Sequence, residues 1–148
     1  MKKTITIFLV LILNLAAFAQ TKTVVSDARA EQMLVGKHRL SLQWISWDYF
    51  GAADVTKRDG VYYLKGSQKS RTDDDYLTID GVIESIDAKE FRFNGKIVSK
   101  VSHINGGAPC ERSGRMTFAA TKNRKYWRLQ EMDNPCDGVT DYIDVFFR

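Results

Sequence analysis

Apolar and polar residues alternate along most of the chain after Gly36. Leu40, Leu42 and Trp44, for example, are separated by single polar residues. Because successive side chains of a strand point to opposite faces, this pattern predicts a strand with one buried face. The same period of two continues to the end of the chain. It predicts eight strands, at residues 37–46, 52–57, 61–66, 76–86, 90–103, 114–121, 125–132 and 140–147.

A short helix is expected before the first strand, over residues 26–34. Ser26 is the expected N-cap, and Asp27 lies near the positively charged start of the helix. Further along, Asn94-Gly95 allows two interpretations: a hairpin turn, or a bend within one long strand. We favour the bent strand, because the apolar residues before and after this pair keep the same phase and Gly95 permits the bend.

Eight consecutive strands joined mostly by short turns predict an all-β fold: an eight-stranded antiparallel up-and-down barrel with a short N-terminal helix. In this topology the connections after the first, third, fifth and seventh strands lie at the same end of the barrel. These are the longer connections, and they form one predicted rim. They cover residues 47–51, 66–75, 105–113 and 133–139.

The only two cysteines, Cys110 and Cys136, both fall in this set of connections. A disulfide between them is therefore geometrically natural, and closing a loop of this length would stabilise the fold by about 3 kcal/mol. The alternative is a metal site that also uses His38 and His103. Because the short ligand spacings of metal sites are absent, we expect the disulfide and no metal.

The first nineteen residues have the pattern of a secretory signal peptide. Lys2 and Lys3 precede an apolar run over residues 5–15, and Ala17-Phe18-Ala19 matches a signal peptidase site. The apolar run is too short to span a membrane. We therefore expect cleavage before Gln20, which divides the chain into a signal (1–19), an N-terminal segment (20–35) and a barrel domain (36–148).

Export changes the charge balance and the expected location. The full chain has 22 basic and 18 acidic residues, so loss of Lys2 and Lys3 leaves 20 against 18. The basic residues are scattered along the sequence, which argues against a nucleic-acid partner. No cysteine lies near the cleavage point to carry a lipid. We expect a periplasmic or secreted monomer without a membrane span.

The predicted architecture resembles the lipocalins and the wider calycin group. A short helix leads into a first strand that begins with Gly36-Lys37-His38, where lipocalins carry Gly-x-Trp, and the meander that follows covers nearly the whole mature chain. The segments 44–50 and 126–130 are also similar to small secreted bacterial proteins of unknown function. The lipocalin resemblance implies a barrel that binds a small apolar ligand in its mouth.

The unusual residues of the chain lie on or near the predicted rim. Trp47, Tyr49 and Phe50 are adjacent, and three aromatic side chains are costly to expose unless they cover the barrel end, line a pocket or meet a partner. His103 and Arg112 flank a glycine-containing loop and are suited to binding an anion or polarising a carbonyl. The predicted ligand-binding residues are Trp44, Trp47, Tyr49, Phe50, His103 and Arg112.

Acidic residues also gather on this rim, which leaves a calcium site as an open alternative. The chain has no EF-hand spacing to support it. The residues concerned are Asp73, Asp74, Asp75, Asp133, Asp137 and Asp141.

Three classes of function remain open. The first is a binding module for a small, partly apolar ligand, which predicts a hollow barrel. The second is a module that binds another envelope or extracellular protein, which predicts a filled barrel with projecting aromatic residues. The third is an enzyme that uses His103 in a cleft beside a carboxylate. No nucleophile and base pair emerges, so we expect no catalytic residue and no cofactor.

Overall fold

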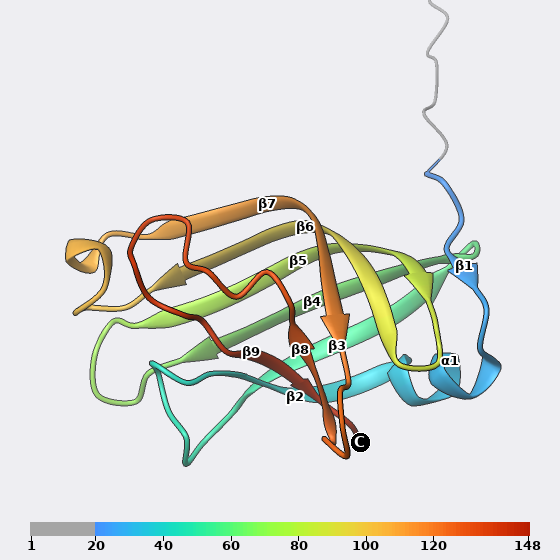
Figure 1. Cartoon of the computed structure of the whole chain (residues 1–148), viewed down its shortest axis with the longest axis horizontal. Helices are drawn as coiled ribbons and strands as arrows, with labels where there is room; N and C mark the ends of the chain where they lie inside the picture. The colour runs from blue at the N-terminus through green and yellow to red at the C-terminus, as the bar shows by residue number, and fades with distance from the viewer. Residues whose placement is uncertain (1–19) are drawn as a thin grey trace, which may run out of the picture.

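The structure is a computed structural model that describes residues 20–148 (Figure 1), so the signal peptide expected at 1–19 lies outside the described residues. Its elements follow the chain as nine strands, one α-helix and one turn of 3-10 helix. They are β1 (Val24–Val25), α1 (Ala28–Leu34), β2 (Gly36–Leu42), β3 (Gly51–Arg58), β4 (Val61–Lys69), β5 (Tyr76–Ile86), β6 (Glu90–Lys100), η1 (Asn105–Gly107), β7 (Cys110–Ala119), β8 (Tyr126–Leu129) and β9 (Ile143–Phe146).

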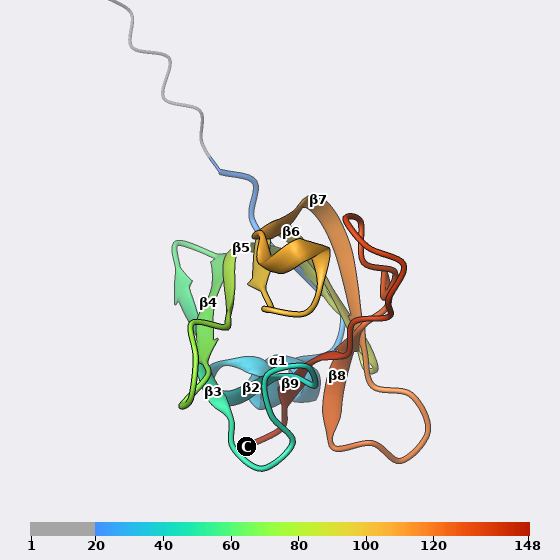
Figure 2. The same cartoon turned by 90° about the vertical axis from the view of Figure 1, so that its left-hand side faces the viewer.

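Strands β2 to β9 form a closed antiparallel barrel, seen end-on in Figure 2. Each strand pairs with the next in the chain, and β2 pairs with β9 to close the ring. The predicted eight-stranded barrel with a short helix is thus confirmed. The two-residue β1 was not predicted; it pairs in parallel with β5, joining Val24 to Ser85 and Val25 to Ile86.

The helix α1 begins later than the sequence predicts. Its N-cap is Asp27, whose carboxylate accepts a hydrogen bond from the amide of Ala30 at 2.7 Å. The prediction of Ser26 as the N-cap is wrong, because Ser26 belongs to the β1 pairing. Its amide and its hydroxyl both donate to the carbonyl of Ile86, at 3.0 and 3.1 Å.

The strand β6 is continuous through Asn94-Gly95, as predicted. Gly81, Gly95 and Gly114 occupy paired positions on β5, β6 and β7. A Cβ atom on Gly95 would lie 2.5 Å from Cζ of Phe93 and 2.6 Å from the Cα of Gly81. Glycine is required at this bend, because the Phe93 ring covers the space that a side chain would fill.

Two strands are shorter than predicted where the barrel closes. β2 ends at Leu42 and β9 begins at Ile143. Beyond them the Gln43 side chain replaces strand pairing: it accepts from the amide of Tyr142 and donates to the carbonyl of Thr140, both at 2.7 Å. A side chain that satisfies backbone groups in this way ends the ladder without leaving them unpaired.

Large side chains fill the barrel interior. Phe91 stacks on Phe118 with ring centroids 5.0 Å apart, and Phe93 meets Phe118 edge to face at 6.1 Å. Aliphatic side chains from every barrel strand except β7 complete one continuous apolar cluster, to which β7 contributes Met116 and Phe118. The interior is therefore a packed core.

The helix α1 covers one end of the barrel, on the right of Figure 1. Ala30 and Leu34 are buried, and Met33 packs against the same core. His38, at the start of β2, is buried with its two ring nitrogens 2.7 and 2.8 Å from the carbonyl oxygens of Leu34 and Phe146. These contacts fix the helix to both strands that close the barrel.

Within residues 20–148, the structure contains no helix that is long and apolar enough to cross a membrane.

Candidate functional site

The opposite end of the barrel carries four long connections, which we call the loop rim (Figure 2). They comprise residues 43–50, 70–75, 101–109 and 130–142. This is the end at which the sequence placed the candidate site.

The predicted disulfide is present and holds the loop rim together. Cys110 and Cys136 are bonded, and their Cα atoms are 5.9 Å apart. Cys110 is the first residue of β7, which begins earlier than predicted because β6 pairs as far as Ser99 with Cys110. The bond thus ties the 130–142 connection directly to a barrel strand.

Beside the disulfide, Asp141 organises a buried polar cluster. Its carboxylate accepts hydrogen bonds from the indole of Trp44 and the side-chain amide of Asn134, each at 3.0 Å, and from the guanidinium of Arg112. Arg112 also donates to the carbonyl of Glu131 at 2.5 Å. The side chains of Asp141 and Arg112 are 1% and 11% exposed, so this ion pair is internal to the rim and Arg112 has its charge neutralised there.

Trp44 and His103 lie on the outer side of this cluster. Their rings meet edge to face with centroids 5.9 Å apart. Trp44 packs against the core, whereas His103 is exposed on the surface. An enzyme that uses His103 would need this side chain in a cleft, whereas the structure places it on the surface.

Trp47 differs from the other rim aromatics because its side chain projects from the protein. It is 65% exposed. The loop that carries it is nevertheless held in place: the hydroxyl of Ser46 accepts from the amides of Asp48 and Tyr49, at 3.0 and 3.1 Å. An exposed tryptophan on an ordered loop is the main apolar feature of the rim surface.

Tyr49 and Phe50 make separate contacts with neighbouring side chains. The hydroxyl of Tyr49 accepts from the amide of Arg71 at 3.1 Å, and the Arg71 guanidinium lies 4.3 Å from the Tyr49 ring centroid. This contact joins two rim connections. Phe50 lies on the outer wall of the barrel, between Arg39 at 4.7 Å and Phe146 at 5.0 Å. The six predicted ligand-binding residues therefore divide among four places, with only Trp44, His103 and Arg112 brought together around Asp141.

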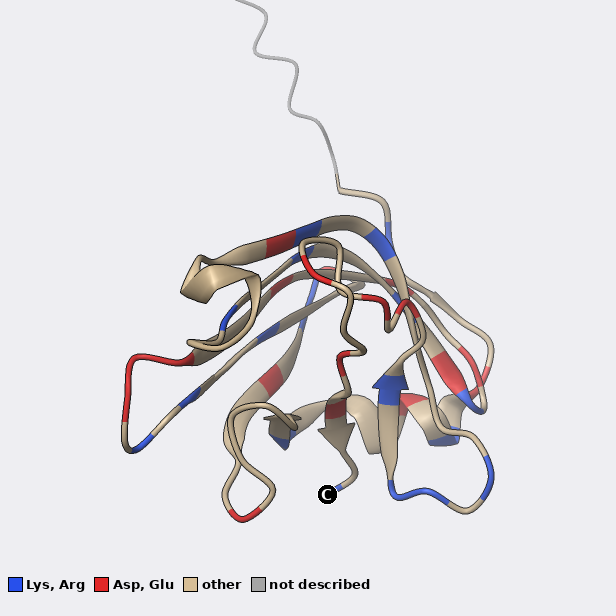
Figure 3. Ribbon diagram, turned by 60° about the vertical axis from the view of Figure 1, so that its left-hand side comes forward, with Lys and Arg blue, Asp and Glu red and all other residues tan. Residues whose placement is uncertain are grey.

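The loop rim is strongly acidic (Figure 3). Its four connections contain eight acidic residues and one basic residue, Arg71. The eight are Asp48, Asp73, Asp74, Asp75, Glu131, Asp133, Asp137 and Asp141. The fold thus places at one end the six acidic residues that the order of the connections assigned to this rim, together with Asp48 and Glu131.

Two of these acids have a lowered pKa and stay charged in mildly acidic solution. A hydrogen bond from the Ser70 side chain, followed by one from the amide of Asp75, lowers the pKa of Asp73. The amides of Asn105 and Gly138 lower the pKa of Asp137. Both carboxylates therefore serve as loop supports while they keep their negative charge.

The acids of the rim do not converge on one point. In the part of the chain that the structure describes, no group of three or more His, Cys, Asp or Glu residues is placed to hold a metal ion. Asp75, for example, is buried and binds the amide and hydroxyl of Ser102 at 2.8 and 3.2 Å.

Buried polar residues that support the rim were not predicted from the sequence. Gln68 is 1% exposed; its side chain accepts from the amide of Leu42 at 2.7 Å and donates to the carbonyl of Tyr49 at 3.2 Å. The available signal was its inward phase, which it shares with Leu64 in the same strand. A polar residue at an inward position indicates a buried hydrogen-bonding role.

Fold and site together define a small, disulfide-bonded antiparallel β-barrel protein with a packed core and an acidic loop rim. The chain belongs to the PM1083 family, whose model matches residues 22–147. It is 44% identical over 135 residues to a protein described as "Uncharacterized protein PM1083" from Pasteurella multocida (strain Pm70), covering 91% of this chain and 87% of that protein. No solved structure matches. The barrel implied by the lipocalin resemblance is confirmed, whereas the family that the comparisons show is PM1083.

Proposed function

We propose that this protein is an exported, non-enzymatic binding module whose loop rim binds another protein of the envelope or the extracellular space. The observation that carries the proposal is Trp47, which is 65% exposed on a loop held by hydrogen bonds to Ser46. Tryptophan is enriched among the residues that dominate binding energy at protein interfaces. A loop that is already ordered loses little entropy on binding, which favours affinity.

The packed interior favours a protein partner over a small ligand inside the barrel. The small-ligand hypothesis requires space between the strands, and side chains such as Phe91, Phe93 and Phe118 occupy that space. A filled barrel with a projecting aromatic side chain is the arrangement that the protein-binding hypothesis requires.

The acidic connections around Trp47 favour a partner with a basic surface. Asp141 is neutralised by Arg112, and the other seven acidic residues against one basic residue create a negative field at this end of the molecule. Opposite charges steer association and discriminate between partners, while Trp47 supplies affinity when a partner covers it. The Cys110–Cys136 disulfide supports an oxidising compartment and is consistent with the export proposed from the N-terminal pattern.

The test compares Trp47→Ala with Val24→Ala, because Val24 is also 65% exposed but lies on β1, away from the rim. Each protein is immobilised and exposed to a periplasmic extract, and a partner captured by the wild type is then purified for affinity measurement. We expect Trp47→Ala to weaken binding about 30-fold or more, the size of a hot-spot loss of about 2 kcal/mol. Val24→Ala should bind as the wild type does.

Equal capture by wild type and Trp47→Ala contradicts the proposal. So does native mass spectrometry that finds a small molecule held by the barrel and released on denaturation, because that result supports the small-ligand alternative. Raised salt should slow association with the partner if the acidic connections steer it.

A further inference from the structure

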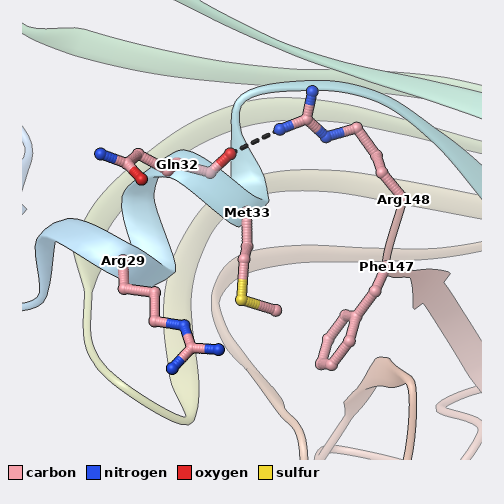
Figure 4. Close-up of a pocket in the computed structure, with 5 residues that line it drawn as sticks. All are labelled: Arg29, Gln32, Met33, Phe147 and Arg148. Carbon is pink, nitrogen blue, oxygen red and sulfur yellow. Dashed lines mark hydrogen bonds between the residues drawn. The ribbon is translucent and has the colours of Figure 1, made fainter.

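A second site lies at the other end of the barrel, between α1 and the residues that follow β9 (Figure 4). It is a surface pocket of about 300 Å³. Arg29, Gln32 and Met33 line it from one face of α1, and Phe147 and Arg148 line it from the end of the chain. This pocket is separate from the loop rim and takes no part in the function proposed above.

The floor of the pocket is apolar and fixed. Met33 and Phe147 are both half-buried and pack against the barrel core. The Phe147 ring lies 4.3 Å, centroid to centroid, from the ring of Trp127, which is itself buried. An apolar group placed on this floor would contact surfaces whose positions the core already determines.

The edges of the pocket are positively charged. Arg148 folds back over α1, where its guanidinium donates to the carbonyl of Gln32 at 2.5 Å. It lies against Gly36, where a Cβ atom would come within 3.1 Å of Nη1 of Arg148. Arg29 stands one helical turn before Met33. Across residues 20–148, neither arginine takes part in any of the ion pairs that the structure forms.

The acidic residues of the helix are engaged elsewhere. Asp27 caps the helix through the amide of Ala30. Glu31 points to the other side, where it accepts hydrogen bonds from the hydroxyl of Tyr62 and, at 3.0 Å, from the ammonium of Lys57. Neither acidic residue of this segment therefore pairs with Arg29 or Arg148 in the part of the chain that the structure describes.

A neighbouring depression extends the positive surface. It shares Phe147 and Arg148 with the pocket and adds Lys37 and Arg39. The two depressions together place four cationic side chains around one half-buried phenyl ring.

We propose that this pocket binds a small amphiphilic anion, with its apolar group on Met33 and Phe147 and its carboxylate or phosphate at the guanidinium of Arg29 or of Arg148, which lie on opposite sides of Met33 (Figure 4). Guanidinium groups match the geometry of both headgroups and bind them through paired, charge-assisted hydrogen bonds. The pocket is at the small end of the usual range for ligand sites, which suits a compact molecule.

Methionine methyl groups offer a direct test by NMR. The protein is labelled with ¹³C at the methionine methyls, whose signals include Met33 in the pocket, Met116 in the core and Met132 near the rim. Hexanoate and hexyl phosphate are titrated separately to distinguish the two headgroups. We expect at least one of them to shift the Met33 signal in a saturable manner while Met116 and Met132 stay unchanged.

An uncharged probe and a purely ionic probe test the charged edges and the apolar floor of the pocket separately. Hexanol lacks the charge and inorganic phosphate lacks the apolar group, so each should bind at least 10-fold more weakly than the effective anion. The double variant Arg29→Gln, Arg148→Gln should bind the anion at least 10-fold more weakly than the wild type. The matched control Arg92→Gln, which removes an exposed arginine from the barrel wall, should bind it with unchanged affinity.

Three results would overturn the proposal: no saturable shift of Met33 with either anion, equal affinity for hexanol, or unchanged affinity in the double variant. The unchanged Met116 signal verifies that each variant keeps its core.

Discussion

The two ends of this barrel are closed by different kinds of interaction. The helix end is closed by apolar packing, with Leu34 and Ala30 of α1 buried against the core. The loop rim is closed by a disulfide and by buried polar groups centred on Asp141. Apolar packing spreads its contribution over many atoms, whereas a polar network depends on each of its members.

Charge divides the two ends in the same way. The rim connections contain eight acidic residues and one basic residue. The segments of the described chain at the helix end, residues 20–35, 59–60, 87–89, 120–125 and 147–148, contain seven basic and four acidic residues. A near-neutral chain is thus folded into a molecule with two ends of opposite charge, each suited to a different partner.

The sharpest test of this contrast is Asp141→Ala. Removing the carboxylate leaves Arg112 as an uncompensated charge that is only 11% exposed. We expect the free energy of unfolding to fall by about 3–5 kcal/mol, measured by urea denaturation. Asp133→Ala, which removes an exposed acid from the same connection, is the control and should change little. A loss below about 1 kcal/mol for Asp141→Ala would show that the rim does not depend on this pair.

The next largest effect is expected from the double variant Cys110→Ser, Cys136→Ser. The disulfide closes a sequence separation of 26 residues. Its loss should cost about 3 kcal/mol. Hydrogen exchange should locate the loss: the backbone amides of Asn134 and Asp141 in the rim should exchange faster. The exchange rate of the Val35 amide at the end of α1 should change only as far as the global stability changes. An equal increase in exchange at both ends would show that the disulfide does not act on the rim alone.

A smaller effect is expected from replacing the histidines, one at each end. His38→Phe leaves the carbonyls of Leu34 and Phe146 without the ring nitrogens that now lie 2.7 and 2.8 Å away. This should cost about 1–3 kcal/mol in urea denaturation. His103→Phe makes the same change at an exposed site and should alter the free energy of unfolding by no more than about 0.5 kcal/mol. Equal losses for the two variants would remove the distinction.

The smallest effect is a pH dependence at the helix end. The hydroxyl of Tyr62, and then Lys57, lowers the pKa of Glu31 below its ordinary value of 4.5. The stability that this carboxylate contributes is therefore present above pH 4.5 and is lost as the pH falls through the lowered pKa. The difference in thermal unfolding between wild type and Glu31→Gln should be present at pH 6 and should shrink as the pH is lowered below 4.5. A difference that does not depend on pH would assign the effect to packing.

The sequence predicted the barrel well, because each strand shows an alternation of apolar and polar residues. A row such as Leu40 and Leu42 specifies its buried face without knowledge of the partner strand, and the order of connections then places both cysteines at one end. Side-chain pairs that are distant in sequence produce no such local pattern. Arg112 was identified as a candidate site residue, but its pairing with Asp141 depends on how the 130–142 connection folds over the rim.

The aromatic residues of the rim show the same limit. Trp44 and Trp47 are three positions apart in an irregular segment, and nothing in the local pattern distinguishes them. One donates a hydrogen bond to buried Asp141 and the other projects from the surface. Only the contacts of the completed rim decide which of the two is available to a partner. The Ser26 prediction failed for a related reason, since β1 was too short to be recognised.

The glycine row across β5, β6 and β7 also has a consequence for finding distant relatives. Gly81, Gly95 and Gly114 are separated by 14 and 19 positions, which the hairpin lengths of the two connections determine. A Cβ atom on Gly81 or Gly95 would lie within 2.7 Å of neighbouring atoms, and Gly114 has a φ of +106°, so each of the three positions favours glycine. We expect relatives too divergent for overall identity to keep this three-glycine spacing, adjusted only where a connection gains or loses residues.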